Sequence, residues 1–530
     1  MNNDTVTISR EEYESLKKAN AELTMQVKWL TEQITLARKQ RFGSSSEQSK
    51  YDDGSEQLSF LFNEAEVYAA SAKATPEVDL TTVKEHSRKK KRITSAADLP
   101  EDIETEIVER TLSDEELVCP QCGNQMTEIG QDVIRRLKIV PAKFVVVETH
   151  IHRYACGNCQ QNAENTPVVS AKDDPPVIPG GNATPEAVAY LATEKFVMHS
   201  PLYRMEQQFK SSGIPLSRQT MSNWLLRSSE LWLEPLWQQM KTQWLQNDIL
   251  HADETTLQVL NEPGRKAKDK SYMWLYRTGR TAEQQLVLYE YQETRGAEHP
   301  ETFLRGYKGY LHTDGYAVYH KLPKDIRVVG CMAHARRKFD EALKAIPEAD
   351  RKGSAAERGV QYFDVLFNIE EKLDEMDLTD EERTVRRREM AEKPLAELHD
   401  WAFRLNAAPK SALGKAAHYT REQWPWLIAY LEDGRLEISN NRAERSIKPF
   451  VMSRKNFLFA NTPNGAKASS IYFSLIETAK ENGLDPYRYL VWVLTNAPWQ
   501  DMNDPAQVDM LLPMNAPEEC RAAGRITSQD

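Results

Sequence analysis

Two pairs of cysteines carry the strongest chemical signal in the chain. Each pair has two residues between its cysteines, so both thiolates of one turn can reach the same ion, and a second such turn completes a tetrahedral site. The pairs are Cys119 with Cys122 and Cys156 with Cys159. A redox centre would need only one pair, and disulfides do not persist in the reducing compartment that we expect for this chain. The spacing therefore predicts one structural Zn²⁺ per chain.

The segment between the two pairs favours a zinc-ribbon hairpin. Residues 143–152 are mostly β-branched or aromatic, and we expect them to form a strand. His150 and His152 lie within it and are a weaker alternative source of zinc ligands, because exposed strand residues explain them as well.

Three carboxylates form a second candidate centre. Asp253 lies inside a predicted strand over 249–257, and Asp314 ends a predicted strand over 309–313. In one sheet with these strands as neighbours, both carboxylates converge on the same edge, and Glu444 can approach them from a late helix. Clustered carboxylates repel one another unless a cation holds them, and hard oxygen ligands favour Mg²⁺ or Mn²⁺ over zinc. Each carboxylate alone is weaker evidence, since an Asp before Gly is often a turn residue and Glu444 between two arginines could form a surface ion pair.

Basic stretches flank these acids. Four basic residues and no acidic ones lie between 327 and 339, and six basic residues against two acidic ones lie between 435 and 459. Positive charge beside an acidic metal site suits a phosphodiester substrate. The candidate DNA contacts are Arg41, Arg218, Arg336, Arg337, Lys448, Arg454 and Lys455.

The order of elements around the carboxylates predicts the fold. Three strands come first, then a short helix, two further strands and a basic helix, over 249–257, 272–277, 285–291, 300–304, 309–313, 326–331 and 333–343. Three antiparallel strands followed by alternating helices and strands is the RNase H-like order. The charged stretch 346–433 reads as helical and interrupts this fold as an all-α insertion.

A helix-turn-helix pattern precedes the sheet. Thr184 and Pro185 mark a helix start, a second helix covers 201–210, and Gly213 lies in the turn before a helix that opens at Ser217. This pattern is typical of DNA-binding helices, although an ordinary helical hairpin shares it.

The first segment repeats apolar residues every seven positions. Four heptads place Leu16, Leu23, Leu30 and Ala37 at position d and Tyr13, Asn20, Val27 and Ile34 at position a. Unbroken heptads without Gly or Pro predict a parallel coiled coil, in which a lone Asn at an a position sets the register. The alternative is one amphipathic helix packed on its own chain.

Length and composition limit the class of protein. A chain of 530 residues with 40% hydrophobic residues is expected to fold as several units. No apolar run approaches the roughly 20 residues of a membrane span, and charge runs through the first thirty residues, so we expect a cytoplasmic protein without a membrane partner. The net charge of −11 includes −8 from 98–118 and −4 from 500–530, which leaves about +1 for the rest. An acidic total therefore does not exclude a nucleic-acid partner.

A long, ordered set of motifs points to one family. These motifs are Arg41-Phe42-Gly43, 57–64, Cys119–Gly123 with its partner pair, 200–204, 252–255, 313–316, 331–339, 440–445 and 454–456. Over about residues 16–495 the chain resembles the insertion sequence 66 family of bacterial DDE transposases.

The resemblance implies a transposase that binds double-stranded DNA, both the terminal inverted repeats of an insertion sequence and the target. It implies that Asp253, Asp314 and Glu444 are the catalytic triad and hold two Mg²⁺ (or Mn²⁺) ions. Cys331 and His334 match a Cys-x-x-His feature that is thought to organise the site in several such transposases. Pairing of protomers through the coiled coil, as a homodimer or higher oligomer, and small accessory proteins of the same element also follow from this reading.

Together these observations predict a multi-domain α/β protein. Its expected parts are a leucine-zipper coiled coil (8–42), a linker (43–100), a four-cysteine zinc domain (101–172), helix-turn-helix-like helices (180–245), an RNase H-like core (246–345 and 434–480) with its α-helical insertion (346–433), and a C-terminal tail (481–530). Two other functions stay open at this point: a non-catalytic, zinc-dependent DNA-binding regulator, and an RNase H-like nuclease without joining activity.

Overall fold

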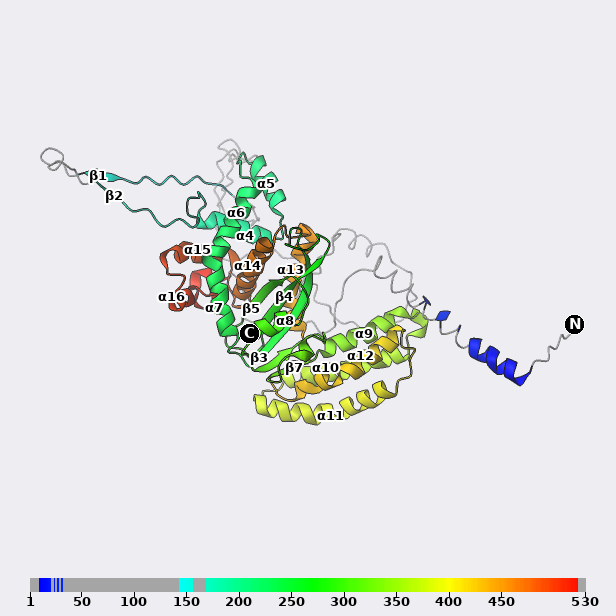
Figure 1. Ribbon diagram of the computed structural model, residues 1–530. Helices are drawn as coiled ribbons and strands as arrows, with labels where there is room; N and C mark the ends of the chain where they lie inside the picture. The colour runs from blue at the N-terminus through cyan, green and yellow to red at the C-terminus, as the bar shows by residue number, and fades with distance from the viewer. Residues whose placement is uncertain are drawn as a thin grey trace, which may run out of the picture. The chain divides into compact units, whose positions relative to one another are not determined.

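The structure is a computed structural model of the chain (Figure 1). It describes residues 9–20, 23, 26, 27, 30, 31, 143–155 and 168–522. The chain divides into two compact units, one formed by 1–45 and 174–525 and the other by 46–173 and 526–530. The four cysteines of the predicted zinc site and Arg41 lie outside the described residues.

A five-stranded mixed sheet forms the centre of the larger unit. Its strands are β3 (Ile249–Gln258), β4 (Lys270–Thr278), β5 (Val287–Gln292), β6 (Gly309–His312) and β7 (Ile326–Val329). The strand order is β5-β4-β3-β6-β7, with the first three strands antiparallel and β3, β6 and β7 parallel. The sequence predicts these five strands and makes neighbours of the first and the fourth, and the structure confirms both; Asp253 lies in β3, whereas Asp314 follows the end of β6.

Both faces of this sheet are covered by other elements. Successive residues along β4 point to opposite faces, and they are buried on both. Trp274, Leu275 and Tyr276 have no exposed surface. Helix α13 (Asn441–Phe457) packs on β3, and α14 (Pro463–Glu481) packs along β5.

Helix α14 also protects the edge strand β5. The backbone N–H of Tyr289 donates to Ser474 Oγ at 2.8 Å, and that of Val287 donates to Thr478 Oγ1 at 3.0 Å. Side-chain hydroxyl groups thus replace a neighbouring strand, which leaves less of this edge open to another chain.

The predicted all-α insertion consists of helices throughout. Its long helices are α10 (Ala355–Asp374), α11 (Asp380–Arg404) and α12 (Ala412–Leu427). Helices α10 and α12 pack against α9 (Met332–Ala345), and α11 packs on α10 and α12 at the outer side (Figure 1). Each begins at a Ser or Thr whose side chain accepts a backbone N–H in the first turn, and Thr379 and Glu382 form a full capping box.

The helices before the sheet match the expected pattern. They are α4 (Pro185–Phe196), α5 (Leu202–Ser211), α6 (Arg218–Ser228) and α7 (Glu234–Trp244). Thr184 and Ser217 cap α4 and α6, and Gly213, with φ of +77°, allows the sharp turn between α5 and α6. Their apolar faces join the same core as the sheet.

The segment after 481, which the sequence leaves as a tail, is folded as far as it is described. It contains α15 (Pro486–Asn496) and α16 (Pro505–Asp509), with short single-turn helices between and after them. Tyr489, Leu490 and Leu494 have no exposed surface and belong to the main core. The sequence did not predict this folded segment, because the stretch is acidic overall and its apolar residues are spread over several short helices.

The smaller unit corrects one expectation. Residues 143–152 form no strand; β1 (Arg153–Ala155) follows them and pairs antiparallel with β2 (Val168–Ser170). A strand needs a partner for its backbone groups, and among the described residues β2 offers one only from residue 153 onward. His150 and His152 are exposed.

The described part of the N-terminal segment is helical. The helix covers residues 10–20, and Ser9 and Glu12 exchange hydrogen bonds at its start. Leu16, Leu23 and Val27 are about 60% exposed within the single chain, so the predicted seam is open there. Self-association through this seam stays a prediction. Within the described ranges, no helix has the length and apolar character needed to cross a membrane.

Candidate active site

Asp253 lies in the middle strand of the sheet. Its Oδ1 accepts the backbone N–H of Glu254 at 2.8 Å. Burial raises the pKa of Asp253 well above its usual value, and the nearby carboxylates of Glu254, Asp314 and Glu444 raise it further. Because neighbouring carboxylates repel one another when ionised, a bound cation would stabilise them, and the surroundings of Asp253 therefore favour a cation.

Asp314 lies two residues beyond the end of β6. His312 at that end is in register with His251 on β3, so each strand places its aspartate two residues after the same pair. Asp314 is held in a tight turn: its Oδ1 accepts the backbone N–H of Tyr316 at 2.9 Å, and Gly315 has a φ of +91°. The parallel pairing of β3 and β6 thus brings the two predicted aspartates to one edge.

Glu444 reaches this edge from the first turn of α13. Its Oε2 accepts a hydrogen bond from Arg337 Nη2 at 2.8 Å, and its Oε1 lies 3.2 Å from His334 Nδ1. Glu444 is close enough to raise the pKa of Asp253. The structure therefore brings together all three predicted carboxylates, but it pairs Glu444 directly with residues of α9.

Asn440 ties three elements of the site together. It is fully buried; its backbone N–H donates to Cys331 Sγ at 3.1 Å, and its side-chain amide donates to the carbonyl of Ala252 at 2.9 Å. Its Oδ1 accepts from His251 Nδ1 at 2.9 Å. The start of α9, the strand with Asp253 and the start of α13 are thereby held in one arrangement. The sequence shows Asn440 within a motif but not this role.

A fourth carboxylate, Glu254, lies beside the three predicted ones. Its side chain is 1% exposed, accepts the hydroxyl of Tyr319 at 2.7 Å and pairs with Arg295. Burial raises the pKa of Glu254, and the charge of Asp314 adds to this effect. Arg295 in turn lies 3.6 Å above the ring of Tyr316. Because side chains alternate between the two faces of a strand, the sequence predicts that Glu254, next to Asp253, points away from the site. The charge interaction between Glu254 and Asp314 corrects that expectation.

Three of the predicted DNA contacts are already engaged within the protein. Arg336 pairs with Asp364 at 2.7 Å, and Arg337 pairs with Glu444. Arg454 Nη1 donates to Thr256 Oγ1 at 2.7 Å and so ties α13 to β3.

The other described candidates are exposed. Lys448 and Lys455 lie on the outer face of α13 together with Arg445. Arg218 opens α6, lies over the ring of Tyr203 at 5.8 Å and forms a long ion pair of 3.9 Å with Glu206, yet its side chain stays mostly exposed. These side chains are placed where an external phosphate could reach them.

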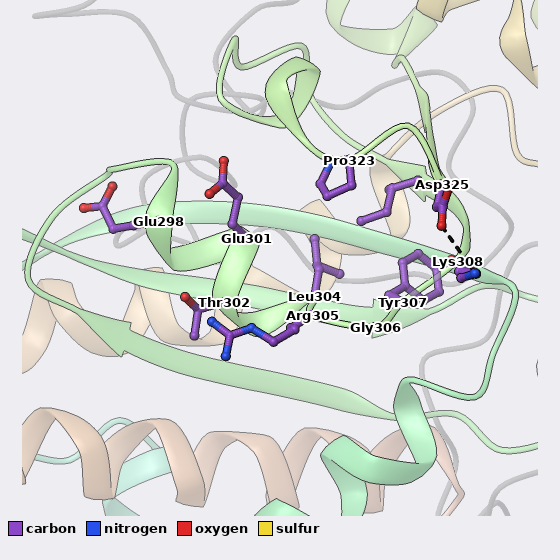
Figure 2. A pocket seen from close by; sticks show the side chains of 11 residues that line it. Glu298, Glu301, Thr302, Leu304, Arg305, Gly306, Tyr307, Lys308, Pro323 and Asp325 are labelled. Carbon is purple, nitrogen blue, oxygen red and sulfur yellow. Dashed lines mark ion pairs between the residues drawn. The ribbon is translucent and has the colours of Figure 1, made fainter.

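A pocket of about 400 Å³ lies at the opposite end of β6 (Figure 2). Its lining includes Tyr307, Lys308 and Ile326, close to the first residues of β6 and β7, whereas Asp314 follows the last residue of β6. Figure 2 shows the ion pair between Lys308 and Asp325 at its rim, 3.4 Å long. The pocket is therefore separate from the carboxylates.

Comparison with protein families identifies the chain. The family model described as "Transposase IS66 family" matches residues 180–468, more than half of the sequence. The chain belongs to the IS66 family of transposases. Within this IS66 chain, the zinc-finger binding domain of transposase IS66 matches 116–160, and the IS66 C-terminal element matches 474–514. A model described as "Transposase C of IS166 homeodomain" matches 29–108.

The IS66 chain also has curated relatives in Sinorhizobium fredii. The uncharacterized protein y4jD is 32% identical over 72% of this chain and 74% of its own length. The uncharacterized protein y4hP is 30% identical over 74% of this chain and 72% of its own length, and y4qI is 29% identical over 92% and 88%.

The family assignment bears directly on metals. The zinc-finger match contains all four paired cysteines, which supports Zn²⁺ binding by this domain. Membership of a DDE family implies a divalent metal at the carboxylates, and their residue types and mutual repulsion fit such an ion.

Proposed function

We propose that this IS66 protein is the DNA transposase of an insertion sequence. It binds the terminal inverted repeats of its element, cleaves strands there and joins them to target DNA. The observation that carries this proposal is the gathering of Asp253, Asp314 and Glu444 at one edge of the sheet, from a central strand, the end of its parallel neighbour and a following helix.

The sheet supports an RNase H-like assignment for the core. Three antiparallel strands followed by two parallel ones, in the order β5-β4-β3-β6-β7, are what that fold requires. The all-α insertion then separates the last strand from α13, which carries the third carboxylate.

Asp253, Asp314 and Glu444 would hold the divalent ions, Mg²⁺ or Mn²⁺, as a pair. Such ions, when bound, activate the attacking oxygen and stabilise the leaving oxygen of a phosphodiester. The protein supplies the positions: the turn at Gly315 sets Asp314, Asn440 sets the start of α13, and Arg337 orients Glu444.

Two exposed surfaces suit the DNA. The outer face of α6 presents Arg218, Gln219, Asn223 and Arg227, residue types that read base edges. The outer face of α13 presents Arg445, Lys448 and Lys455, which suit phosphate contacts next to the carboxylates. The zinc domain would add contacts to the repeats, and the N-terminal helix would pair protomers. Small accessory proteins of the same element are further proposed partners, and a reaction without them tests whether cleavage and joining need them.

The experiment compares wild type with Asp253→Asn, Asp314→Asn and Glu444→Gln on labelled element ends and a target plasmid in Mg²⁺. Cleavage and joining should fall by several orders of magnitude in each variant, because the ions supply most of the stabilisation of the transition state. Binding of the ends should persist, since phosphate contacts come from basic side chains.

Glu301→Gln is the matched control, because Glu301 is an exposed carboxylate at the pocket beyond the other end of β6. Glu254→Gln is a poor control, since the buried Glu254 holds Arg295 and Tyr319. Near-normal joining by Asp314→Asn would overturn the proposal. Cleavage without joined products would favour the nuclease, and end binding without any metal-dependent cleavage would favour the regulator.

A further inference from the structure

We propose that Cys331, His334 and Glu444 form a second transition-metal site, distinct from the four-cysteine site and suited to Zn²⁺. One ligand atom from each of the three residues lies within 4.8 Å of the other two. Among the residues that the structure describes, this is the one group of three His, Cys, Asp or Glu side chains gathered so closely.

Two buried atoms of this group lack a partner that a metal would supply. His334 Nδ1 and Glu444 Oε1 are 3.2 Å apart, yet their geometry is not that of a hydrogen bond. Both atoms are shielded from solvent, and neither has another hydrogen-bond partner among the described residues. Unsatisfied buried polar atoms are costly, so their convergence beside a thiol calls for a ligand between them.

The local backbone explains why the three side chains converge. Cys331 is the residue before the first turn of α9, and His334 is the third residue of that helix, so both side chains point towards the helix start. Glu444 approaches from the first turn of α13. The Asn440 N–H that donates to Cys331 Sγ fixes these two helix starts to each other. The chelate is therefore built on two anchored elements.

The ligand types select the ion. One sulfur, one imidazole nitrogen and one carboxylate oxygen suit Zn²⁺, whereas Mg²⁺ takes oxygen ligands. Zinc bonds of roughly 2.0–2.3 Å would draw the three atoms slightly closer together. Metal on His334 Nδ1 places the ring proton on Nε2, so the long contact from Arg337 at 3.4 Å is lost. Arg337 keeps its 2.8 Å bond to Glu444, as an outer partner of a ligating carboxylate.

The site has a consequence that rests on the proposed function. Glu444 would serve two centres, and zinc bound with Cys331 and His334 would withhold it from the two aspartates. Zinc should then compete with Mg²⁺-dependent strand cleavage, so that this site regulates the transposase through Glu444.

The test is zinc binding by the full chain, purified with ZnCl₂ in the buffer and freed of loose metal by gel filtration. Wild type should retain roughly one more zinc per chain than Cys331→Ser or His334→Asn, because each variant removes one of only three protein ligands. Co²⁺ in place of zinc should add a thiolate-to-metal absorption band that Cys331→Ser loses. Cys520→Ser is the matched control, since Cys520 is the other buried free cysteine in the described part of the chain and lies in the C-terminal segment.

Equal zinc content in wild type and both variants would overturn the site. Should Cys331→Ser fail to fold, the His334→Asn variant decides, because His334 is half-buried and on a helix surface. If wild type binds no additional zinc but still cleaves DNA in Mg²⁺, this inference is refuted and the proposed transposase function stands. Zinc binding by wild type, together with no strand cleavage in Mg²⁺ by protein purified without added zinc, would leave the site standing and refute the transposase proposal.

Discussion

The hydroxyl group of Tyr419 donates a hydrogen bond of 2.6 Å to the backbone carbonyl of Asp314. Tyr419 belongs to α12 of the helical insertion, and Asp314 follows β6 of the sheet. The insertion therefore holds the turn that presents a candidate catalytic carboxylate. The ring of Tyr419 also packs under Lys338 of α9, whose Nζ lies 4.8 Å from the ring centre.

Tyr419→Phe should slow strand cleavage several-fold and lower the free energy of unfolding by about 1 kcal/mol, the usual net value of one hydrogen bond. The ring and its packing stay, so only the restraint on Asp314 is lost. Single-turnover cleavage and urea unfolding measure the two effects. Tyr362→Phe, on α10 of the same insertion, should change neither, and an equal loss in both variants would contradict a role for this bond.

Arg387 should be essential to the stability of the insertion. Its side chain has no exposed surface; it binds Glu370 at 2.7 Å and donates to the carbonyls of Tyr430 and Leu436, on the path to α13. Arg387→Ala leaves Glu370 with Arg383 alone, at 2.9 Å, and removes the donor from both buried carbonyls. Since each buried group that loses its partner costs about 1–3 kcal/mol, the variant should lose roughly 3–5 kcal/mol of stability. Thermal unfolding followed by circular dichroism measures the loss.

The control is the exposed ion pair between Arg386 and Glu389, in which Arg386 is the residue directly before Arg387 in α11. Both side chains are more than half exposed, so Arg386→Ala should change stability by less than about 1 kcal/mol. Similar losses in Arg386→Ala and Arg387→Ala would show that burial does not decide the effect.

Lys448 and Lys455 should contribute phosphate contacts. Changing both to Gln should weaken binding to element ends and to unrelated DNA alike, and should lower the slope of log K against log salt by about 0.9 for each lost contact. Fluorescence anisotropy over a salt series gives this slope. Lys393→Gln, on the exposed surface of α11, should leave it unchanged. A loss confined to the element ends would instead indicate base readout by these lysines.

Glu290 should make stability depend on pH. Burial raises the pKa of this carboxyl to about 7, and the charge of Lys241 only partly offsets it. The folded chain thus keeps a proton that the unfolded chain releases near its ordinary pKa. Stability should therefore fall as the pH rises from about 4.5 to about 7.

Glu290→Gln should flatten that slope and stabilise the protein above pH 7, by an amount on the order of 1–3 kcal/mol. Urea midpoints between pH 5 and pH 8 check this. Glu283→Gln, an exposed carboxylate before the same strand, serves as the control. An unchanged pH profile in Glu290→Gln would mean that another group causes the dependence.

Local patterns along the chain were enough to predict most of the elements. Thr184, Gly213 and Ser217 mark helix boundaries through hydrogen bonds and backbone angles that involve only their own neighbours. The strand that contains Asp253 and the strand that precedes Asp314 follow from short apolar runs. The folded segment after 481 was not predicted, because its main helix, α15, packs on α4, which lies far away in the chain.

The sequence by itself determined the residue types at the centre: three carboxylates, a Cys-x-x-His pair and flanking basic residues in a fixed order. Only the tertiary structure decided what each of them touches. It occupied Arg336, Arg337 and Arg454 with protein partners, brought Glu254 beside Asp314, and set Glu444 against His334. Hydrogen bonds and charge interactions act over a few ångströms, and these residues, which lie between 28 and 198 positions apart, come within that range only after the sheet, the insertion and α13 have packed together.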